Sequence, residues 1–262
     1  VIGINTAIIA EGGASLGIGF AIPGDLAKPV VEQLEEFGET RRGWLGVGIQ
    51  DVTDDIAAAV GRPDAHGAMV TDVTSPGPSA GVLKEGDIIL SFDGKPIDKM
   101  HDLPRLVAET EVGKLVPLTL VRDGKTETVT ITLGRLDDGQ HTARPARSAP
   151  PPPAKPATKG HTLGDELGFE LAPIDATARK TYALPTGSKG LVITSVKSGS
   201  DADEKGLAPG LVVAEANWRK VEKVADVEAA LEDVRRAGRP AMLFKVVDPT
   251  GQGRFIAVKI GG

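Results

Sequence analysis

The sequence predicts a mainly β or α+β protein with two similar small domains, preceded by the last strands and helix of another domain. Three observations predict this organisation. Short β-branched runs alternate with turn residues, and Gly (33) and Pro (19) are frequent among the 262 residues. The pattern of residues 40–136 recurs over residues 163–262. A Pro-rich stretch between the two copies lacks the apolar periodicity of a helix or a strand.

The composition excludes several kinds of site and partner. The chain has no Cys, so it can form neither a disulfide framework nor a Cys-based zinc site. Its net charge of −6 disfavours a surface that coats nucleic acid or an anionic membrane. No apolar run reaches the ~18 residues of a membrane helix. The four His residues share no metal-ligand spacing. We therefore expect no nucleic-acid partner, no integral membrane segment and no metal site.

Residues 1–39 predict two strands and a helix. The run 1–9 is β-branched and apolar, and residues 17–22 alternate small with large side chains, as closely packed strands do. Apolar side chains at helical spacing follow, with Asp25 as the expected N-cap and Gly38 as the C-terminal stop. Two strands and one helix are too few to bury a core. We therefore expect this segment to be the end of a domain that belongs to a longer chain.

Residues 40–136 predict the first small domain. The β-branched and apolar runs that predict its strands are 45–50, 68–73, 87–92, 116–122 and 126–133. A helix is predicted over 99–109, where apolar side chains recur on one face. Asp123 and Gly124 lie between the last two strands and are typical of a type I′ hairpin turn.

Residues 137–162 predict a linker. The stretch 149–157 is rich in Pro, which favours an extended polyproline II spacer. The alternative is a ligand for a domain of the SH3 type, which binds such segments.

The second copy, residues 163–262, follows the first at a nearly constant offset. Leu45–Val47 matches Leu167–Phe169 at an offset of 122 residues. Gly67–Val73 matches Gly190–Val196 at an offset of 123. A drifting offset indicates a duplication with small insertions, and hence two domains of one fold. At an offset of 124, the helical stripe of Met100, Leu103 and Val107 matches Val224, Val227 and Leu231.

Residues 70–97 carry a recognisable motif. An apolar strand leads into a turn of small residues, and the sequence AGVLKEGD at Ala80–Asp87 then precedes the next strand. This stretch resembles the PDZ domain, in its permuted bacterial form. The resemblance implies that each copy is a small β-sandwich or partly open barrel with helices.

The start of the chain resembles a second family. Val1–Thr6 and Gly17–Pro23 are similar to the end of the chymotrypsin-like domain of the HtrA/DegP serine endoproteases, and the order of segments matches that family over the whole chain. The resemblance implies a periplasmic, ATP-independent protease, often also a chaperone, that acts in stress response and protein quality control. It places the catalytic Ser, His and Asp before Val1. We therefore expect this chain to hold no catalytic residue and no cofactor, and to be inactive alone.

A PDZ domain binds an extended peptide as an added strand at a sheet edge. A Gly in the loop ahead of that edge lets several N–H groups approach the terminal carboxylate of the peptide. In the first copy this loop is Trp44, Leu45, Gly46 and Val47, and Arg42 lies upstream, where it can attract an anion. The last side chain of the peptide is expected to lie among Leu45, Val47, Met100, Leu103 and Val107, which favours an apolar C-terminus.

The second copy has an equivalent loop with different flanking charges. Its expected peptide-binding residues are Leu167, Gly168, Phe169, Val224, Val227 and Leu231. This loop is flanked by Asp165 and Glu166 rather than by a pair of Arg residues, and two carboxylates disfavour a bound carboxylate. The sequence leaves open whether this copy binds free C-termini, binds internal segments or only packs.

By the same resemblance, Ile4, Asn5 and Thr6 form a strand that pairs with substrate backbone beside the S1 pocket. The expected partners are unfolded or misfolded proteins and their C-terminal peptides, and further copies of the chain in a trimer-based assembly.

Several other interpretations remain at this stage. The PDZ surfaces can serve mainly to hold an oligomer together, or the chain can be a stand-alone PDZ adaptor. The apolar stripe of the helix can be core packing alone. Trp44 can stack on a ligand or on a neighbouring domain, and Trp218 can anchor an interface. Ser15 fits a short Gly-x-Ser-x-Gly pattern, but a loop serine is the better interpretation.

Overall fold

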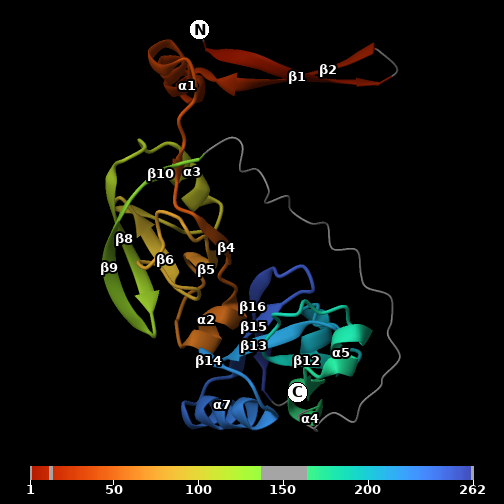
Figure 1. Ribbon diagram of the computed structural model, residues 1–262. Coiled ribbons are helices and arrows are strands. Elements are labelled where there is room, and N and C mark those ends of the chain that lie inside the picture. The colour runs from red at the N-terminus through yellow and green to blue at the C-terminus, as the bar shows by residue number, and fades with distance from the viewer. Residues whose placement is uncertain (1, 12–13, 137–163, 261–262) are drawn as a thin grey trace.

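The structure is a computed structural model that describes residues 2–11, 14–136 and 164–260. The protein is mainly β with several helices, as the sequence predicts, and the strands of the described residues form two six-stranded sheets and two two-stranded ones. The predicted linker, 137–162, lies outside the described residues. Figure 1 shows an N-terminal arm that projects from two β-rich bodies packed side by side. We call residues 43–135 the first repeat and residues 164–260 the second repeat.

The arm is a hairpin followed by a helix. Strands β1 (Gly3–Glu11) and β2 (Ala14–Pro23) pair antiparallel, and α1 (Gly24–Phe37) ends at Gly38 in the left-handed conformation (φ 72°). The expectation that Asp25 is the N-cap is wrong: the N-cap is Pro23, two residues earlier, and the Asp25 carboxylate accepts a hydrogen bond from its neighbour Leu26. Helix α1 buries none of its residues. Among the arm residues whose burial the structure describes, 2–7 and 17–37, none is buried.

The first repeat contains one six-stranded antiparallel sheet in the order β4-β5-β6-β8-β9, with β7 paired to β6, and a separate β3–β10 pair. Its elements are β3 (Gly43–Trp44), β4 (Val47–Asp51), α2 (Asp54–Val60), β5 (Ala68–Val73), β6 (Ile88–Phe92), β7 (Lys95–Pro96), α3 (Asp102–Ala108), β8 (Leu115–Arg122), β9 (Lys125–Thr132) and β10 (Gly134–Arg135).

The second repeat has the same sheet order, β11-β12-β13-β15-β16, with β14 paired to β13. The topology thus repeats along with the sequence. The elements are α4 (Gly164–Leu167), β11 (Phe169–Pro173), α5 (Ala176–Thr181), β12 (Leu191–Val196), α6 (Asp201–Glu204), β13 (Val212–Ala216), β14 (Arg219–Lys220), α7 (Val224–Arg236), β15 (Ala241–Val247) and β16 (Gly253–Lys259).

Two local features of the first repeat differ from the sequence prediction. Helix α3 is shorter than the predicted 99–109, so Met100 lies in the turn before it, where its carbonyl accepts a hydrogen bond from the Leu103 N–H (3.3 Å). Helix α2 was not predicted; the Thr53 hydroxyl caps its N-terminus by accepting from Ile56 N–H (3.3 Å). The predicted turn at Asp123 and Gly124 is confirmed, since both residues have positive φ (51° and 75°).

The two repeats pack against each other through an apolar cluster, here called the inter-repeat cluster. The first repeat contributes Val52, Ile56, Ala57, Ala59, Met69 and Ile88, and the second contributes Ala241, Leu243, Phe255 and Ala257, with Trp218 packed against them. In Figure 1, α2 lies against β15 and β16. Burial of this apolar surface favours a docked pair of repeats.

Charged residues around the inter-repeat cluster are complementary. Asp55 and Glu85 of the first repeat form ion pairs with Lys205 (2.7 Å) and Lys245 of the second. The Arg239 guanidinium donates to the carbonyl of Ala59 (3.1 Å), in the last turn of α2. A cation at this place is favourable because a helix C-terminus carries a partial negative charge.

Asp55 makes this docking sensitive to acid. A hydrogen bond from Lys205, with the charges of Lys205 and Lys259, holds the pKa of Asp55 below its ordinary value of 3.8 despite partial burial. Asp201 also pairs with Lys205 (2.9 Å). Because the docked state favours ionised Asp55, its contribution is present above the ordinary pKa and is lost as the pH falls through the lowered one.

We therefore expect the docked repeats to separate more readily below about pH 4 than at pH 7. The rotational correlation times of the two repeats, measured by amide relaxation across that range, check this. Asp55→Asn should weaken docking at pH 7 and flatten the acid response. An identical acid response in wild type and Asp55→Asn would show that Asp55 is not the responsible group.

Candidate peptide-binding edge

Strand β4 forms one edge of the first sheet. In the described part of the chain it pairs with β5 and with no other strand, from Val47↔Val73 to Asp51↔Ala68. Its outer side therefore offers main-chain groups to which another extended segment can pair. We call this side the β4 edge. In the second repeat, β11 is the equivalent edge strand.

Residues 44–47, here called the Gly46 loop, lead into β4 and are held in place by contacts within the first repeat. Gly46 has φ +72°, which favours glycine, and a Cβ there would meet Pro78 at 3.1 Å and the Trp44 ring at 3.3 Å. The carbonyl of Leu45 accepts from the buried hydroxyl of Ser79 (2.6 Å), and that of Gly46 accepts from Thr74 N–H (2.8 Å). Both carbonyl oxygens are thus engaged within the repeat.

The five predicted lining residues of the first repeat belong to one apolar cluster, but they divide into two kinds. Leu45, Leu103 and Val107 are buried core members, with exposed fractions of 3, 1 and 6 %. Val47 and Met100 are half-buried and pack against that core. Core packing thus accounts for the buried three, while Val47 and Met100 keep accessible apolar surface.

Ile49 is a further residue of this kind that the prediction missed. It is half-buried, packs against the same core and follows Val47 by two positions in β4. Residues two apart in a strand share a face. The alternation Val47, Gly48, Ile49 was the signal that could have found it.

The two predicted arginines have different surroundings. The Arg41 guanidinium lies 3.9 Å above the Phe37 ring and 3.5 Å from Glu39, so it belongs to the junction with the arm. A hydrogen bond from Arg135, with smaller effects of Arg41, holds the pKa of Glu39 below its usual value. Arg42 is exposed, and no ion pair of its side chain occurs within the described residues. Arg42 is therefore available to an anionic ligand.

Trp44 stacks within its own repeat. Its ring lies near Gly46 and Gly134, at 3.3 and 3.5 Å from the positions that a Cβ would take on these residues. The Trp44 ring thus contacts the rest of the Gly46 loop within the first repeat, and its expected stacking on a ligand or on a neighbouring domain stays a prediction.

The second repeat builds the same loop with different neighbours. Gly168 has φ +76°, and its carbonyl accepts from Lys197 N–H (2.8 Å). Glu166 forms an ion pair of 2.6 Å with Arg235 of α7, so one of the flanking carboxylates is neutralised. The predicted lining residues Leu167, Phe169, Val227 and Leu231 are all at most 3 % exposed, and Val224 packs against them half-buried.

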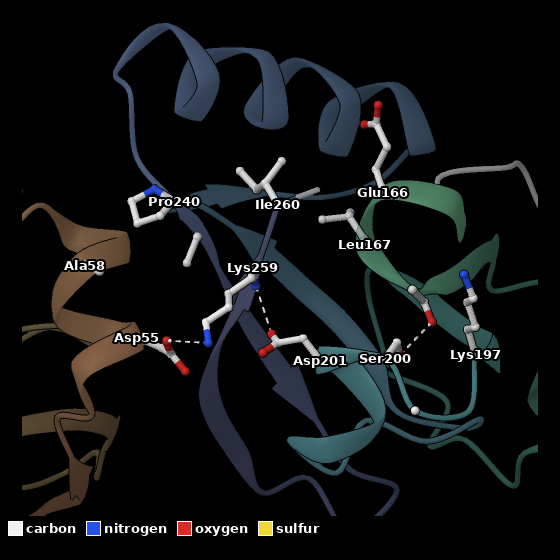
Figure 2. Close-up of a pocket in the computed structure, with 13 residues that line it drawn as sticks. Asp55, Ala58, Glu166, Leu167, Lys197, Ser200, Asp201, Pro240, Lys259 and Ile260 are labelled. Atoms are coloured by element: carbon white, nitrogen blue, oxygen red, sulfur yellow. Dashed lines mark hydrogen bonds and ion pairs between the residues drawn. The ribbon is translucent and has the colours of Figure 1, made fainter. Parts of the chain in front are cut away.

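A hollow of about 460 Å³ lies beside the Gly168 loop and has walls from both repeats. Figure 2 shows Asp55 and Ala58 of α2 on one side, facing Lys259 of β16, and Leu167, Lys197 and Ser200 on the other. Asp55 and Lys259 form an ion pair of 3.7 Å across it. The sequence gives no sign of this hollow, because its walls are far apart in the chain.

The predicted protease remnant lies in the arm. Ile4 and Asn5 pair with Ile22 and Ala21, and the ladder shifts register between Asn5 and Ala7, at Thr6. The Thr6 hydroxyl donates to the Phe20 carbonyl (3.2 Å), and Ile4 is 46 % exposed. Ser15 lies where the structure does not describe side chains.

None of the described helices is both long and apolar enough to cross a membrane.

Comparisons with known proteins agree with this architecture. The sequence profile of the family described as "PDZ domain" matches residues 43–133. The chain is 37% identical over 262 residues to a "Probable periplasmic serine endoprotease DegP-like" of Rhizobium meliloti, covering 99% of this chain and 49% of that protein. A protein of the same description from Bartonella henselae is 36% identical over 261 residues, covering 99% and 48%.

Among solved structures, the chain is similar to an "HtrA-type protease AlgW with decapeptide" (TM-score 0.46, 37% identity, 52% of this chain and 42% of that one). The chain spans about half the length of the curated relatives that it matches. The sequence match extends over the arm and both repeats, and the PDZ profile falls on the first repeat with its β4 edge. Over 99% of its length the chain is thus related to the HtrA/DegP serine endoproteases, and its first repeat contains a PDZ domain.

Proposed function

We propose that this chain is the peptide-capturing region of a periplasmic serine endoprotease that acts in protein quality control. The β4 edge of the first repeat would bind C-terminal or exposed hydrophobic segments of misfolded proteins. The observation that carries the proposal is the edge strand β4, which pairs on one side only within the described residues, begins at the Gly46 loop and is bordered by accessible apolar side chains. The periplasmic location is supported by the names of the relatives.

Different groups of the β4 edge would provide affinity, recognition of the carboxylate and selectivity. Main-chain groups of β4 pair with the peptide backbone, which gives affinity for any extended sequence. The Leu45 and Gly46 carbonyls are already bonded within the repeat, which supports a loop that would offer its N–H groups to a terminal carboxylate. Arg42 adds a charge that favours the carboxylate. Val47, Ile49 and Met100 offer apolar contact, which selects an apolar last residue.

A fluorescent peptide that ends in a free apolar residue tests this proposal. The free acid is expected to bind in the micromolar range, and the same peptide with an amidated end at least about tenfold more weakly, because an amide loses the charge-assisted hydrogen bonds. Fluorescence anisotropy measures both. Arg42→Ala should weaken the free acid alone, and Arg62→Ala, whose side chain pairs with Asp64 away from the loop, is the control. Equal binding of acid and amide, or no binding of either, would remove the capture mechanism.

A structural role is the second candidate, and one observation favours it. Large apolar side chains of the arm, among them Phe20 (54 %) and Leu26 (53 %), are exposed. Such surfaces are usually covered in an assembly. If the repeats serve mainly to hold an oligomer together, deleting residues 164–260 will change the assembly size of the full-length protein. Peptide capture predicts an unchanged size.

A further inference from the structure

The second repeat contacts the strand that carries the proposed peptide edge. Gln50 of β4 donates from Nε2 to the carbonyl of Phe255 (2.9 Å), and Phe255 N–H donates to Gln50 Oε1 (2.8 Å). One side-chain amide thus pairs with both main-chain groups of a β16 residue. This pair of bonds fixes Gln50 near the end of the proposed binding strand.

Asp51 and Val52, which follow Gln50, connect the end of β4 to Met100 and to the inter-repeat cluster. Asp51 accepts a hydrogen bond from the N–H of Met100 (3.2 Å), which borders the β4 edge. Val52 is buried in the inter-repeat cluster, and α2 then packs on β15 and β16. The end of β4 is therefore tied to the second repeat and to the peptide-binding side at the same time.

Trp218 is the anchor of the docked arrangement. It follows Asn217 in the turn between β13 and β14, and both have positive φ (69° and 47°), which a bulky residue rarely adopts. Its ring lies 5.6 Å from that of Phe255, between centroids, and covers Gly86 of the first repeat, where a Cβ would come within 2.0 Å of it. A strained turn that places Trp on a glycine of the other repeat persists because docking stabilises it.

We infer that the second repeat is a positioning element for the β4 edge, so that docking and peptide binding strengthen each other. This inference rests on the proposed function. An edge strand with a single neighbour must be ordered when a peptide pairs with it, and the Gln50–Phe255 pair supplies that order beforehand. Because coupling between two equilibria is reciprocal, a bound peptide tightens docking by the same factor.

Trp218→Gly in the full chain tests the inference. Glycine relieves the positive φ at position 218, so the second repeat keeps its own fold while the anchor is lost. Ala183→Gly is the matched control, since Ala183 is an exposed residue of the same repeat with φ 51° and lies outside the inter-repeat cluster. The readouts are the rotational correlation time of each repeat and the affinity for the free-acid peptide.

The wild-type repeats should tumble as one body. In Trp218→Gly they should tumble separately and the peptide should bind about fivefold more weakly or worse, whereas Ala183→Gly should change neither. Gln50→Ala provides a second variant, expected to lower peptide affinity while the cluster keeps the repeats docked.

Independent tumbling of the wild-type repeats would overturn the inference. So would a Trp218→Gly chain that undocks with unchanged peptide affinity. A wild-type chain that tumbles as one body and binds no peptide would remove the proposed function and the coupling together, while establishing the docking. The two failures are therefore distinguishable.

Discussion

Gly46→Val is expected to lower the affinity of the free-acid peptide by about 10- to 100-fold, which corresponds to the loss of one hydrogen-bonded contact to a charged group. A valine side chain disfavours the φ of +72° and meets Pro78 and the Trp44 ring, so the loop must move. Movement of the loop withdraws its N–H groups from the carboxylate. Peptide titration by anisotropy measures the loss.

Gly94→Val is the matched control for that variant. Gly94 has a similar φ of +75°, lies in the turn between β6 and β7, and has nothing within 4 Å of a Cβ. It imposes a comparable backbone cost on the same repeat away from the loop. We expect Gly94→Val to lower stability but not peptide affinity. Equal losses of affinity in both variants would attribute the effect to unfolding rather than to the loop.

Asp87→Ala is expected to destabilise the first repeat by about 3 kcal/mol, the lower end of the usual cost of breaking a buried ion pair, because Arg122 keeps a pair with Glu127 (3.5 Å). Asp87 is 2 % exposed and accepts two hydrogen bonds from the Arg122 guanidinium (2.8 and 2.6 Å). It also accepts from Lys84 N–H (2.8 Å). The ion pair and this hydrogen bond account for the aspartate of the AGVLKEGD motif. Hydrogen exchange of the β6 and β8 amides reports the stability of this repeat.

Two further variants distinguish the loss of the Asp87–Arg122 ion pair from a general loss of stability. Lys114→Ala removes the more exposed pair with Asp93 (2.7 Å) and should change stability by less than about 1 kcal/mol. The double variant Asp87→Ala with Arg122→Met should recover much of the loss, because no buried charge is left alone. A double variant less stable than Asp87→Ala would contradict this account of the pair.

The strands could be predicted because β-branched runs and turn residues determine them locally. The helix end at Gly38 and the Asp123–Gly124 turn could be predicted because these residues readily adopt positive φ. The repeated sheet order could be predicted because the sequence pattern recurs at a nearly fixed offset. Helix α2 could not be predicted from periodicity. It is short and Ala-rich, and its buried residues Ile56, Ala57 and Ala59 pack on the second repeat rather than on its own core.

The inter-repeat contact was only partly visible in the sequence. The sequence makes Trp218 a possible interface anchor, and in the structure Trp218 packs between the repeats. The run Ala241–Phe244 is continuously buried instead of alternating, which is typical of a strand covered on both faces. The pairing of Gln50 with Phe255 could not be foreseen, because the two residues are 205 positions apart and share no motif.

The most direct test of the central claim is a map of amide chemical shifts during titration with the free-acid peptide. The account predicts that the largest changes fall on the Gly46 loop, along β4 and around Met100, with smaller ones at Phe255 through Gln50. Changes confined to the second repeat, or spread evenly over the chain, would contradict peptide capture at the β4 edge.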